Sequence, residues 1–251
     1  MSSESELVKK RFIELARRSY SSNIFTFTDF LGLSEQSDFE EIRRELVGIK
    51  YEKFGGAEGA ERVMIRFGDP EEIGYEVPFP ICAVKISPTS YKFAERLGHR
   101  DYLGALLNLG IERSVLGDIV IFDTETFVFV KDDIAEYIVR ELTRVRRTEV
   151  TASVSEPPAE SLYRTEERTI QLSGERLDAA IAKVFNLSRE DAQLLIRKGV
   201  VFVSGKVTES QAYVPKRGEV ISVRGHGRFV YGEVISLSKK GKLNVSVSVY
   251  L

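Results

Sequence analysis

The apolar and polar positions are most regular between residues 173 and 206, near the end of the chain. Helical spacing of apolar residues predicts two short helices in this stretch. The first carries Leu177, Ile181, Val184 and Phe185, and the second carries Ala192, Leu195 and Ile196. Ser188 stands at the expected N-cap of the second helix, with Asp191 three residues later, and Gly199 follows its last turn. Val201 and Val203 then lead to Ser204-Gly205, which is typical of a tight β-hairpin.

The first 75 residues have the pattern of a small α+β unit. Residues 4–19 place apolar side chains on one face of a helix, and Ser34 is the expected cap of a second helix that runs to about Val47. Alternation over 51–54 and 62–67 predicts two strands, separated by the glycine-rich segment 55–61.

The region that follows predicts strands and helices in the order β-α-β-β-α-β. The strands are 81–87, 118–123, 126–130 and 149–155, and the helices are 99–110 and 133–145. This is the split βαβ order of RNA-recognition-motif and ferredoxin-like domains. Three further strands are predicted at 219–224, 228–238 and 242–251. We therefore expect an α+β protein with domains at 1–75, 76–156 and 170–251, and a proline-containing linker at 157–169.

Composition changes this picture in two ways. The formal net charge of the 251 residues is −2, but residues 171–251 carry 13 Lys and Arg against 7 Asp and Glu, a net +6, which leaves −8 for the rest. A basic module on an acidic body suits a polyanionic partner at one end. The single cysteine, Cys82, excludes an internal disulfide and a cysteine-based zinc site. With no apolar leader pattern and no run of membrane-spanning length, we expect a cytoplasmic protein.

Motifs for catalysis are incomplete. The triplet His99-Arg100-Asp101 resembles the protein-kinase catalytic loop, but Leu106 stands where that loop needs Asn. The glycines of 55–61 do not have the dinucleotide-binding spacing. Only one other histidine, His226, is present, which leaves little for a metal site or a Ser/His triad. We therefore predict no catalytic residues, no metal and no cofactor.

Two predicted strand aromatics, Phe127 and Phe129, stand where RNA-recognition motifs stack bases. The basic and aromatic sequence pattern of those motifs is absent here, and Val128 and Val130 are equally suited to a core. Core packing is therefore favoured for both aromatics, with base stacking as the alternative.

The basic residues of the C-terminal stretch fall outside its apolar positions. Arg176 and Arg189 each open a predicted helix, where the helix dipole disfavours a cation. This placement suggests an external phosphate as their partner, with solvated helix faces as the alternative. The phosphate hypothesis requires both side chains to lie on one side of the module without being buried against carboxylates of the chain itself.

The segment RLDAAIAKVFNLSREDAQLLIRKGVVFVSGK, residues 176–206, resembles the small RNA-binding module named after ribosomal protein S-four. The matching positions are Arg176, Leu177, Asp178, Ser188, Arg189, Ala192, Ile196, Val201, Val203 and Gly205. Ser204 departs from the pattern, since many members carry Asn there. The resemblance implies an αL-motif RNA-binding fold for this domain and RNA contacts at Arg176, Asp178, Lys183, Ser188, Arg189, Arg197, Lys198 and Lys206.

A second resemblance covers nearly the whole chain. The segments FTDFL, GGAEGAER, ICAVKISP and GHRDYLGALLNLGIERSVLGDI, followed by the basic module, resemble the bacterial YlmH family. The module is also similar to that of RqcP-like quality-control factors. These resemblances imply a monomeric, non-catalytic protein that binds large-subunit ribosomal RNA and peptidyl-tRNA in the quality control of stalled nascent chains. A second RNA-contact edge is expected at His99, Arg100 and Arg113.

Two other functions fit the same sequence. Modules of the S-four type often accompany pseudouridine synthases, although the Arg-Leu-Asp sequence at 176–178 lies inside the binding module and residues 1–155 contain no comparable catalytic loop. An adaptor that recruits a protein through the acidic body, for instance in cell division, is the third hypothesis.

Overall fold

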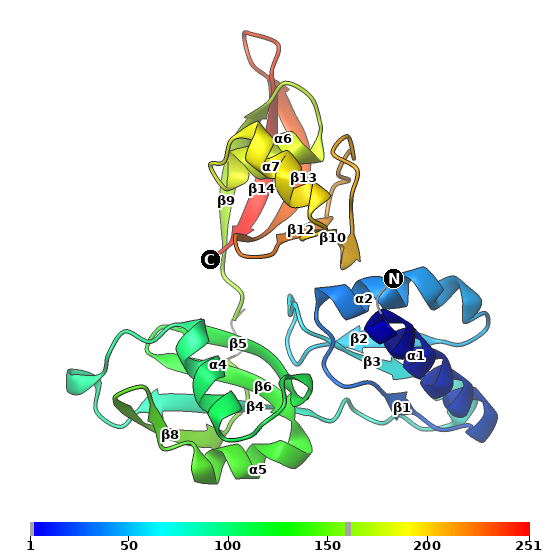
Figure 1. Cartoon of the computed structure of the whole chain (residues 1–251), viewed down its shortest axis with the longest axis vertical. Coiled ribbons are helices and arrows are strands. Elements are labelled where there is room, and N and C mark those ends of the chain that lie inside the picture. The colour runs from blue at the N-terminus through cyan, green and yellow to red at the C-terminus, as the bar shows by residue number, and fades with distance from the viewer. Residues whose placement is uncertain (1–2, 159–161) are drawn as a thin grey trace. The chain divides into compact units, whose positions relative to one another are not determined.

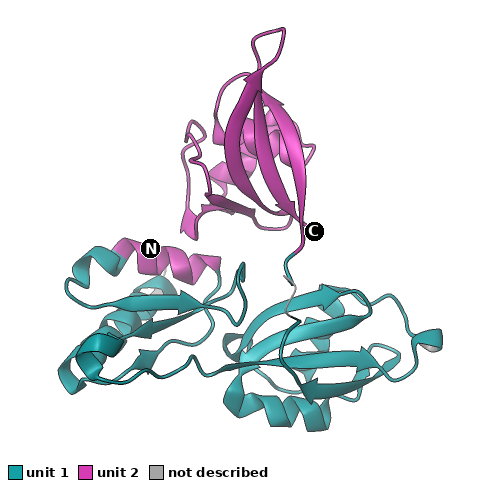
Figure 2. Ribbon diagram, turned by 180° about the vertical axis from the view of Figure 1, so that it is seen from behind, with its two compact units in different colours: residues 1–32, 42–163 teal, residues 33–41, 164–251 magenta. Residues whose placement is uncertain are grey.

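The computed structural model describes residues 3–158 and 162–251, which form a mixed α/β structure with three sheets (Figure 1). They divide into two compact units. The first takes its described residues from 1–32 and 42–163, and the second consists of 33–41 and 164–251 (Figure 2). No helix among the described residues is both long and apolar enough to cross a membrane.

The N-terminal part has a three-stranded sheet of order β1-β3-β2. The elements along this stretch are α1 (Ser3–Ser22), β1 (Thr26–Phe27), α2 (Leu33–Ile42), a 3-10 turn (Arg43–Glu45), β2 (Tyr51–Phe54), β3 (Met64–Phe67) and α3 (Pro70–Ile73). Residues 33–41 of α2 group with the second unit. Helix α1 buries Phe12, Leu15 and Ala16, as its amphipathic pattern predicts. The second helix was predicted to reach Val47 but ends as an α-helix at Ile42, because the chain tightens there into the 3-10 turn.

The central part is a sheet of order β5-β6-β4-β8-β7 in which every pair is antiparallel. Its elements are β4 (Ile81–Pro88), α4 (His99–Asn108), β5 (Leu116–Phe122), β6 (Glu125–Lys131), α5 (Asp132–Glu141), β7 (Arg144–Val145) and β8 (Thr148–Val154). The helix predicted over 133–145 was too long. It stops at Glu141, because Leu142 leaves the helical conformation (φ −82°, ψ 87°). A left-handed residue at Arg146 (φ 53°) then turns the chain back and pairs β7 with β8.

Both faces of this sheet are covered. On the helix side, Val84, Val128 and Val130 pack with Tyr102 and Leu106 of α4. On the other side, Phe127 and Phe129 are 3% and 1% exposed and pack in one cluster with Phe30, Met64, Ala83 and Leu162. The favoured assignment of the two strand aromatics to a core is therefore confirmed, and their rings are not available for base stacking in this structure.

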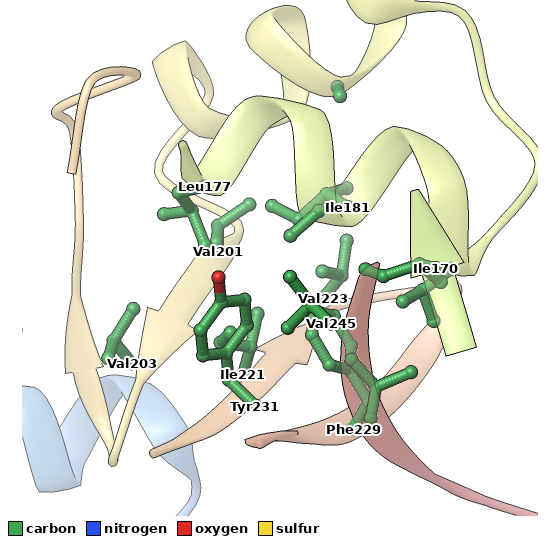
Figure 3. Packing of buried hydrophobic residues seen from close by; sticks show 14 of the residues in the cluster. Ile170, Leu177, Ile181, Val201, Val203, Ile221, Val223, Phe229, Tyr231 and Val245 are labelled. Atoms are coloured by element: carbon green, nitrogen blue, oxygen red, sulfur yellow. The ribbon is translucent and has the colours of Figure 1, made fainter. Parts of the chain in front are cut away.

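The C-terminal unit contains a six-stranded sheet of order β11-β10-β12-β13-β14-β9. Its elements are β9 (Thr165–Leu172), α6 (Leu177–Val184), α7 (Arg189–Arg197), β10 (Val201–Val203), β11 (Lys206–Val207), β12 (Val220–Val223), β13 (Gly227–Leu237) and β14 (Leu243–Tyr250). Leu177 and Ile181 of α6 pack with Ile221, Phe229 and Val245 of the sheet (Figure 3). This packing places the starts of α6 and α7 beside each other.

The linker predicted at 157–169 is wrong over its last five residues, because strand β9 begins at Thr165. Residues 159–161 of the predicted linker lie outside the described residues. Residues 165–169 are all exposed, and the strand buries only Ile170 and Leu172. It is held as an edge strand by antiparallel pairing with β14 from Thr165↔Tyr250 to Leu172↔Leu243. Backbone pairing of this kind leaves little trace in the hydrophobic pattern.

Candidate nucleic-acid interface

The start of α6 places a buried carboxylate beside an arginine. Arg176 is the N-cap residue of α6 and has an extended backbone, and Asp178 is the second helical residue. The Asp178 side chain is 0% exposed. Arg176 donates from Nε to Oδ1 and from Nη2 to Oδ2, both at 3.0 Å. This is the two-point geometry in which a guanidinium binds a carboxylate most firmly.

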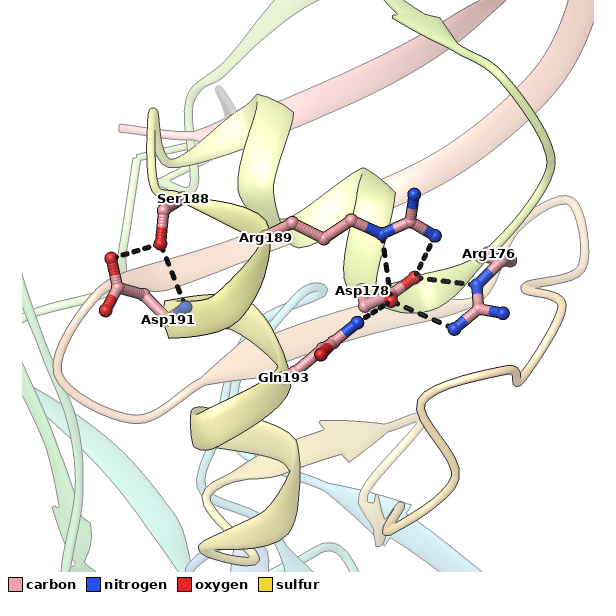
Figure 4. Close-up of polar contacts among 6 residues, drawn as sticks. All are labelled: Arg176, Asp178, Ser188, Arg189, Asp191 and Gln193. Atoms are coloured by element: carbon pink, nitrogen blue, oxygen red, sulfur yellow. Dashed lines mark hydrogen bonds and ion pairs between the residues drawn. The ribbon is translucent and has the colours of Figure 1, made fainter.

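The start of α7 brings a second arginine to the same carboxylate. Arg189 donates from Nε to Oδ2 of Asp178 at 3.2 Å and from Nη2 to Oδ1 at 3.4 Å. Gln193, one helical turn further along α7, donates from Nε2 to Oδ2 at 2.8 Å. We call Arg176 and Arg189, held in this way by Asp178, the guanidinium pair (Figure 4).

The arginines determine the ionisation of Asp178. Burial alone would raise the pKa of this carboxyl, but hydrogen bonds from Arg176, Gln193 and Arg189 outweigh that effect and hold the pKa well below its ordinary value. Asp178 is therefore an anion at neutral pH. It supplies, from within the chain, the negative charge that the sequence pattern assigned to an external phosphate, so the helix-dipole argument for an external partner is weaker than it looked.

The guanidinium pair nevertheless stays accessible. The side chains of Arg176 and Arg189 are 41% and 48% exposed, and they lie on one side of the module. Both use the Nε and Nη2 edge on Asp178, and Figure 4 shows the third guanidinium nitrogen of each directed away from that carboxylate. The structure corrects the assignment of Asp178 as a direct RNA contact, because a fully buried carboxylate cannot reach a ligand; its contacts instead fix the two arginines.

Ser188 also has a structural partner. Its Oγ accepts a hydrogen bond from the Asp191 backbone amide at 3.0 Å and donates to the Asp191 carboxylate at 2.6 Å. The predicted N-cap is confirmed. The remaining basic residues predicted for this surface, Lys183, Arg197, Lys198 and Lys206, are all exposed. Their contact with RNA stays a prediction.

The three residues predicted to form a second RNA edge differ in their exposure. His99 and Arg100 begin α4 and are exposed. Arg113, by contrast, is half-buried and donates from Nη1 to the carbonyl oxygens of Leu116 at 2.8 Å and Gly117 at 3.0 Å. Burial, together with the nearby charge of Arg62, lowers the pKa of Arg113 to about 10. These hydrogen bonds tie Arg113 to the start of β5. Its assignment as an outward-facing RNA contact is therefore corrected.

Sequence reasoning missed Gln193 in this site. Its signal was its place four residues after Arg189, on the same helix face, where the two side chains can reach one partner. Within the described part of the chain, no group of three or more His, Cys, Asp and Glu side chains is arranged to hold a metal ion.

Comparison with known proteins finds similarity in the central domain and along most of the chain. Residues 75–158 match the family model described as "Putative RNA-binding domain in YlmH". The chain is also 29% identical over 233 residues, 87% of its length, to the "Ribosome-associated protein quality control protein P2" of Bacillus subtilis (strain 168), of which the match covers 85%. Because residues 75–158 match this model, we call the central domain the YlmH-type domain. The resemblance to the YlmH family that the sequence indicated is thereby confirmed.

Two further similarities are partial. A 75-residue stretch, 30% of the chain, is 39% identical to an "Uncharacterized RNA pseudouridine synthase" of Aquifex aeolicus (strain VF5), and covers 27% of that protein. A solved structure, "Cell division protein ylmH from Streptococcus pneumoniae", is 19% identical and superposes with a TM-score of 0.48, over 62% of this chain and 93% of that one.

Proposed function

We propose that this protein is a non-catalytic RNA-binding factor of the large ribosomal subunit, which contacts ribosomal RNA and peptidyl-tRNA in the quality control of stalled nascent chains. The YlmH-type domain and the similarity to the Bacillus subtilis quality-control protein over most of both chains support this role. The observation that carries the proposal is the guanidinium pair, in which two exposed arginines of adjacent helices are held by one buried aspartate.

The architecture supports the same proposal. We assign the central domain to the RNA-recognition-motif and ferredoxin-like type, because its strand order β5-β6-β4-β8 and the crossovers through α4 and α5 fit the split βαβ arrangement. We assign the C-terminal unit to the S-four type, because α6 and α7 carry the Arg-Leu-Asp and Ser-Arg positions of that module at their starts.

The guanidinium pair would act on the phosphate backbone. Asp178 fixes the orientation of both arginines before binding, so less side-chain freedom is lost when a phosphate arrives. Each guanidinium keeps a donor group for a charge-assisted hydrogen bond to a phosphate oxygen. Lys183, Arg197, Lys198 and Lys206 would extend the attraction over neighbouring phosphates. Structured RNA is read mainly through its shape and backbone, so we expect little base specificity.

Co-sedimentation with purified large ribosomal subunits tests the proposal. Replacing Arg176 and Arg189 by Ala should weaken binding and lower the slope of log affinity against log salt concentration by about two, one for each lost phosphate contact. The matched control replaces Lys239 and Lys240, two exposed lysines in the β13–β14 turn, by Ala. If the folded arginine variant sediments like the control and the wild type, the assignment of this site is wrong.

The partial match to a pseudouridine synthase keeps a second function in view. The match spans 75 residues and 27% of that protein, which is about the size of one small RNA-binding module. Within the Arg-Leu-Asp sequence of this chain, Asp178 is buried and bound to two arginines, so it is not free to attack a nucleobase. Incubating the protein with ribosomal RNA and analysing the nucleosides checks this alternative. Pseudouridine that forms with the folded protein and not with heat-denatured protein would contradict the non-catalytic proposal.

A further inference from the structure

The YlmH-type domain cannot present its sheet to RNA in the way that RNA-recognition motifs do. Besides the burial of Phe127 and Phe129, the backbone itself lies close to the sheet. A Cβ atom built on Gly56 would lie 2.2 Å from the Phe129 ring, and one built on Gly117 would lie 2.7 Å from the Phe30 ring. No nucleobase fits between surfaces at this distance, so an RNA contact of this domain needs another face.

An open groove lies on the helix side of the same domain. It has a volume of about 480 Å³ and lies between α4, the end of α5 and β7. Three arginines, Arg100, Arg144 and Arg146, line it, and all three are exposed. Its floor includes Gly104, whose missing side chain leaves open space above the helix. We call this the α4–β7 groove.

The acidic side chains of the groove have partners within the chain. Asp101 accepts a hydrogen bond from the Gly98 amide at 2.8 Å and lies 3.4 Å from Nη1 of Arg146. Glu141 accepts from Nε of Arg140 at 2.7 Å. Arg146 and Arg144 keep 63% of their side-chain surface exposed despite their contacts with carboxylates. Exposed pairs of this kind contribute little stability, so breaking them to bind another anion costs little.

The backbone around the groove is held in place. The Glu95 amide donates to Oγ1 of Thr148 at 3.1 Å, so the segment before α4 lies against the β7–β8 hairpin. Arg146 itself occupies the left-handed turn position of the hairpin, at φ 53°, where Asn or Gly is favoured. Arginine is uncommon in this conformation.

We propose that the α4–β7 groove binds the phosphodiester backbone of RNA, so that the YlmH-type domain contacts RNA through its helix side and its hairpin instead of its sheet. Arg144 and Arg146 contribute guanidinium donors from the hairpin, and Arg100 contributes one from α4. The groove has the size of a small-ligand site and an apolar floor under a charged rim, which suits a nucleotide unit with its phosphate. This inference rests on the proposed function and gives it a second contact surface.

The test uses the full chain, a fluorescein-labelled single-stranded oligouridylate and purified large subunits, titrated over a range of salt concentrations. Replacing Arg144 and Arg146 by Ala should weaken binding to the oligouridylate and to the large subunits by about tenfold per guanidinium. It should also lower the slope of log affinity against log salt concentration by about two. The control replaces Lys10 and Arg17, two exposed cations of α1, by Ala and should bind like the wild type.

Comparison with the Arg176→Ala/Arg189→Ala variant separates this inference from the proposed function. If the groove variant binds normally and the guanidinium-pair variant does not, the groove inference is wrong and the proposed function stands. If the groove variant binds weakly and the guanidinium-pair variant binds normally, the groove stands and the site in the C-terminal unit is wrong. Normal binding by both variants overturns both assignments.

A single substitution separates binding from folding. Arg146→Asn keeps a residue that accepts the left-handed turn, so its melting temperature should equal or exceed that of the wild type. Its affinity for the oligouridylate should still fall by about tenfold. A lower melting temperature with unchanged affinity would show that Arg146 serves the turn alone and would overturn its place in the groove.

Discussion

The buried carboxylate of Asp178 accepts a hydrogen bond at 3.2 Å from Nε of Arg189, which lies eleven positions later at the start of the next helix. The contact joins the two short helices at the ends where their dipoles favour an anion. It also means that the orientation of an arginine proposed to bind RNA depends on a residue that RNA cannot touch. Stability and RNA binding should therefore respond together when Asp178 changes.

Asp178→Asn should lower the free energy of unfolding at neutral pH by about 1–3 kcal/mol, toward the low end because solvent screens the two half-exposed arginines. The folded pKa of Asp178 lies below the unfolded value of about 3.9, so its stabilising contribution is complete above that value and is lost as the pH falls. The difference between wild type and variant should stay constant from about pH 5 to 8 and shrink below about pH 4. Urea unfolding across this range measures it; a difference that grows on acidification would contradict the ion-pair assignment.

RNA binding by the same variant distinguishes positioning from net charge. Asp178→Asn makes the C-terminal unit more positive by one charge, so general electrostatic attraction predicts tighter binding to large subunits. If Asp178 acts by orienting Arg176 and Arg189, binding weakens instead, because both side chains regain freedom that binding must then remove. Co-sedimentation at several salt concentrations decides between the two directions.

Ser188→Ala should separate the helix cap from the RNA surface. Removal of Oγ leaves the Asp191 amide without its cap and should cost about 1 kcal/mol of stability, visible as a lower melting temperature. Affinity for large subunits should stay at the wild-type level where the variant is folded. Ser188→Thr keeps a hydroxyl that can accept from the Asp191 amide and donate to the Asp191 carboxylate, so it should recover the melting temperature. A loss of affinity in the folded Ala variant that Thr restores would instead place Ser188 in the RNA contact.

The helices of the C-terminal unit could be predicted because the apolar residues that gave the helical spacing are the ones buried in the structure. Leu177, Ile181 and Ile196 are all 0% exposed. Spacing alone misled at Val145, which was placed at the end of the helix predicted over 133–145. Its side chain is buried from strand β7, which a left-handed turn at Arg146 joins to β8. Tertiary pairing with β8, which no local pattern records, determined the outcome.

The two arginines of the candidate site could be predicted from the sequence, but the contacts that hold them could not. Arg176 and Arg189 stood out because cations at helix starts are unfavourable without a partner. That the partner is Asp178 required the angle between two helices, which depends on the packing of α6 and α7 on their sheet. Gln193 was missed for the same reason. Arg144 fell inside a helix predicted too long and Arg146 directly after it, so a groove between α4 and a hairpin could not be inferred.

Gly56→Ala should disrupt the packing of the glycine-rich segment on the central sheet. The new Cβ would lie 2.2 Å from the ring of Phe129, which is 1% exposed and packed in a buried cluster. We expect a loss of about 2 kcal/mol or more from the steric conflict, in addition to the cost of placing Ala at φ +97°. Gly74→Ala is the matched control, because Gly74 has a similar φ of +86° and no heavy atom within 4 Å of its added Cβ. Denaturant unfolding followed by circular dichroism, since the chain has no tryptophan, compares the two variants. Equal losses would mean that only backbone conformation matters at Gly56, and the close contact that covers the sheet would then be wrong.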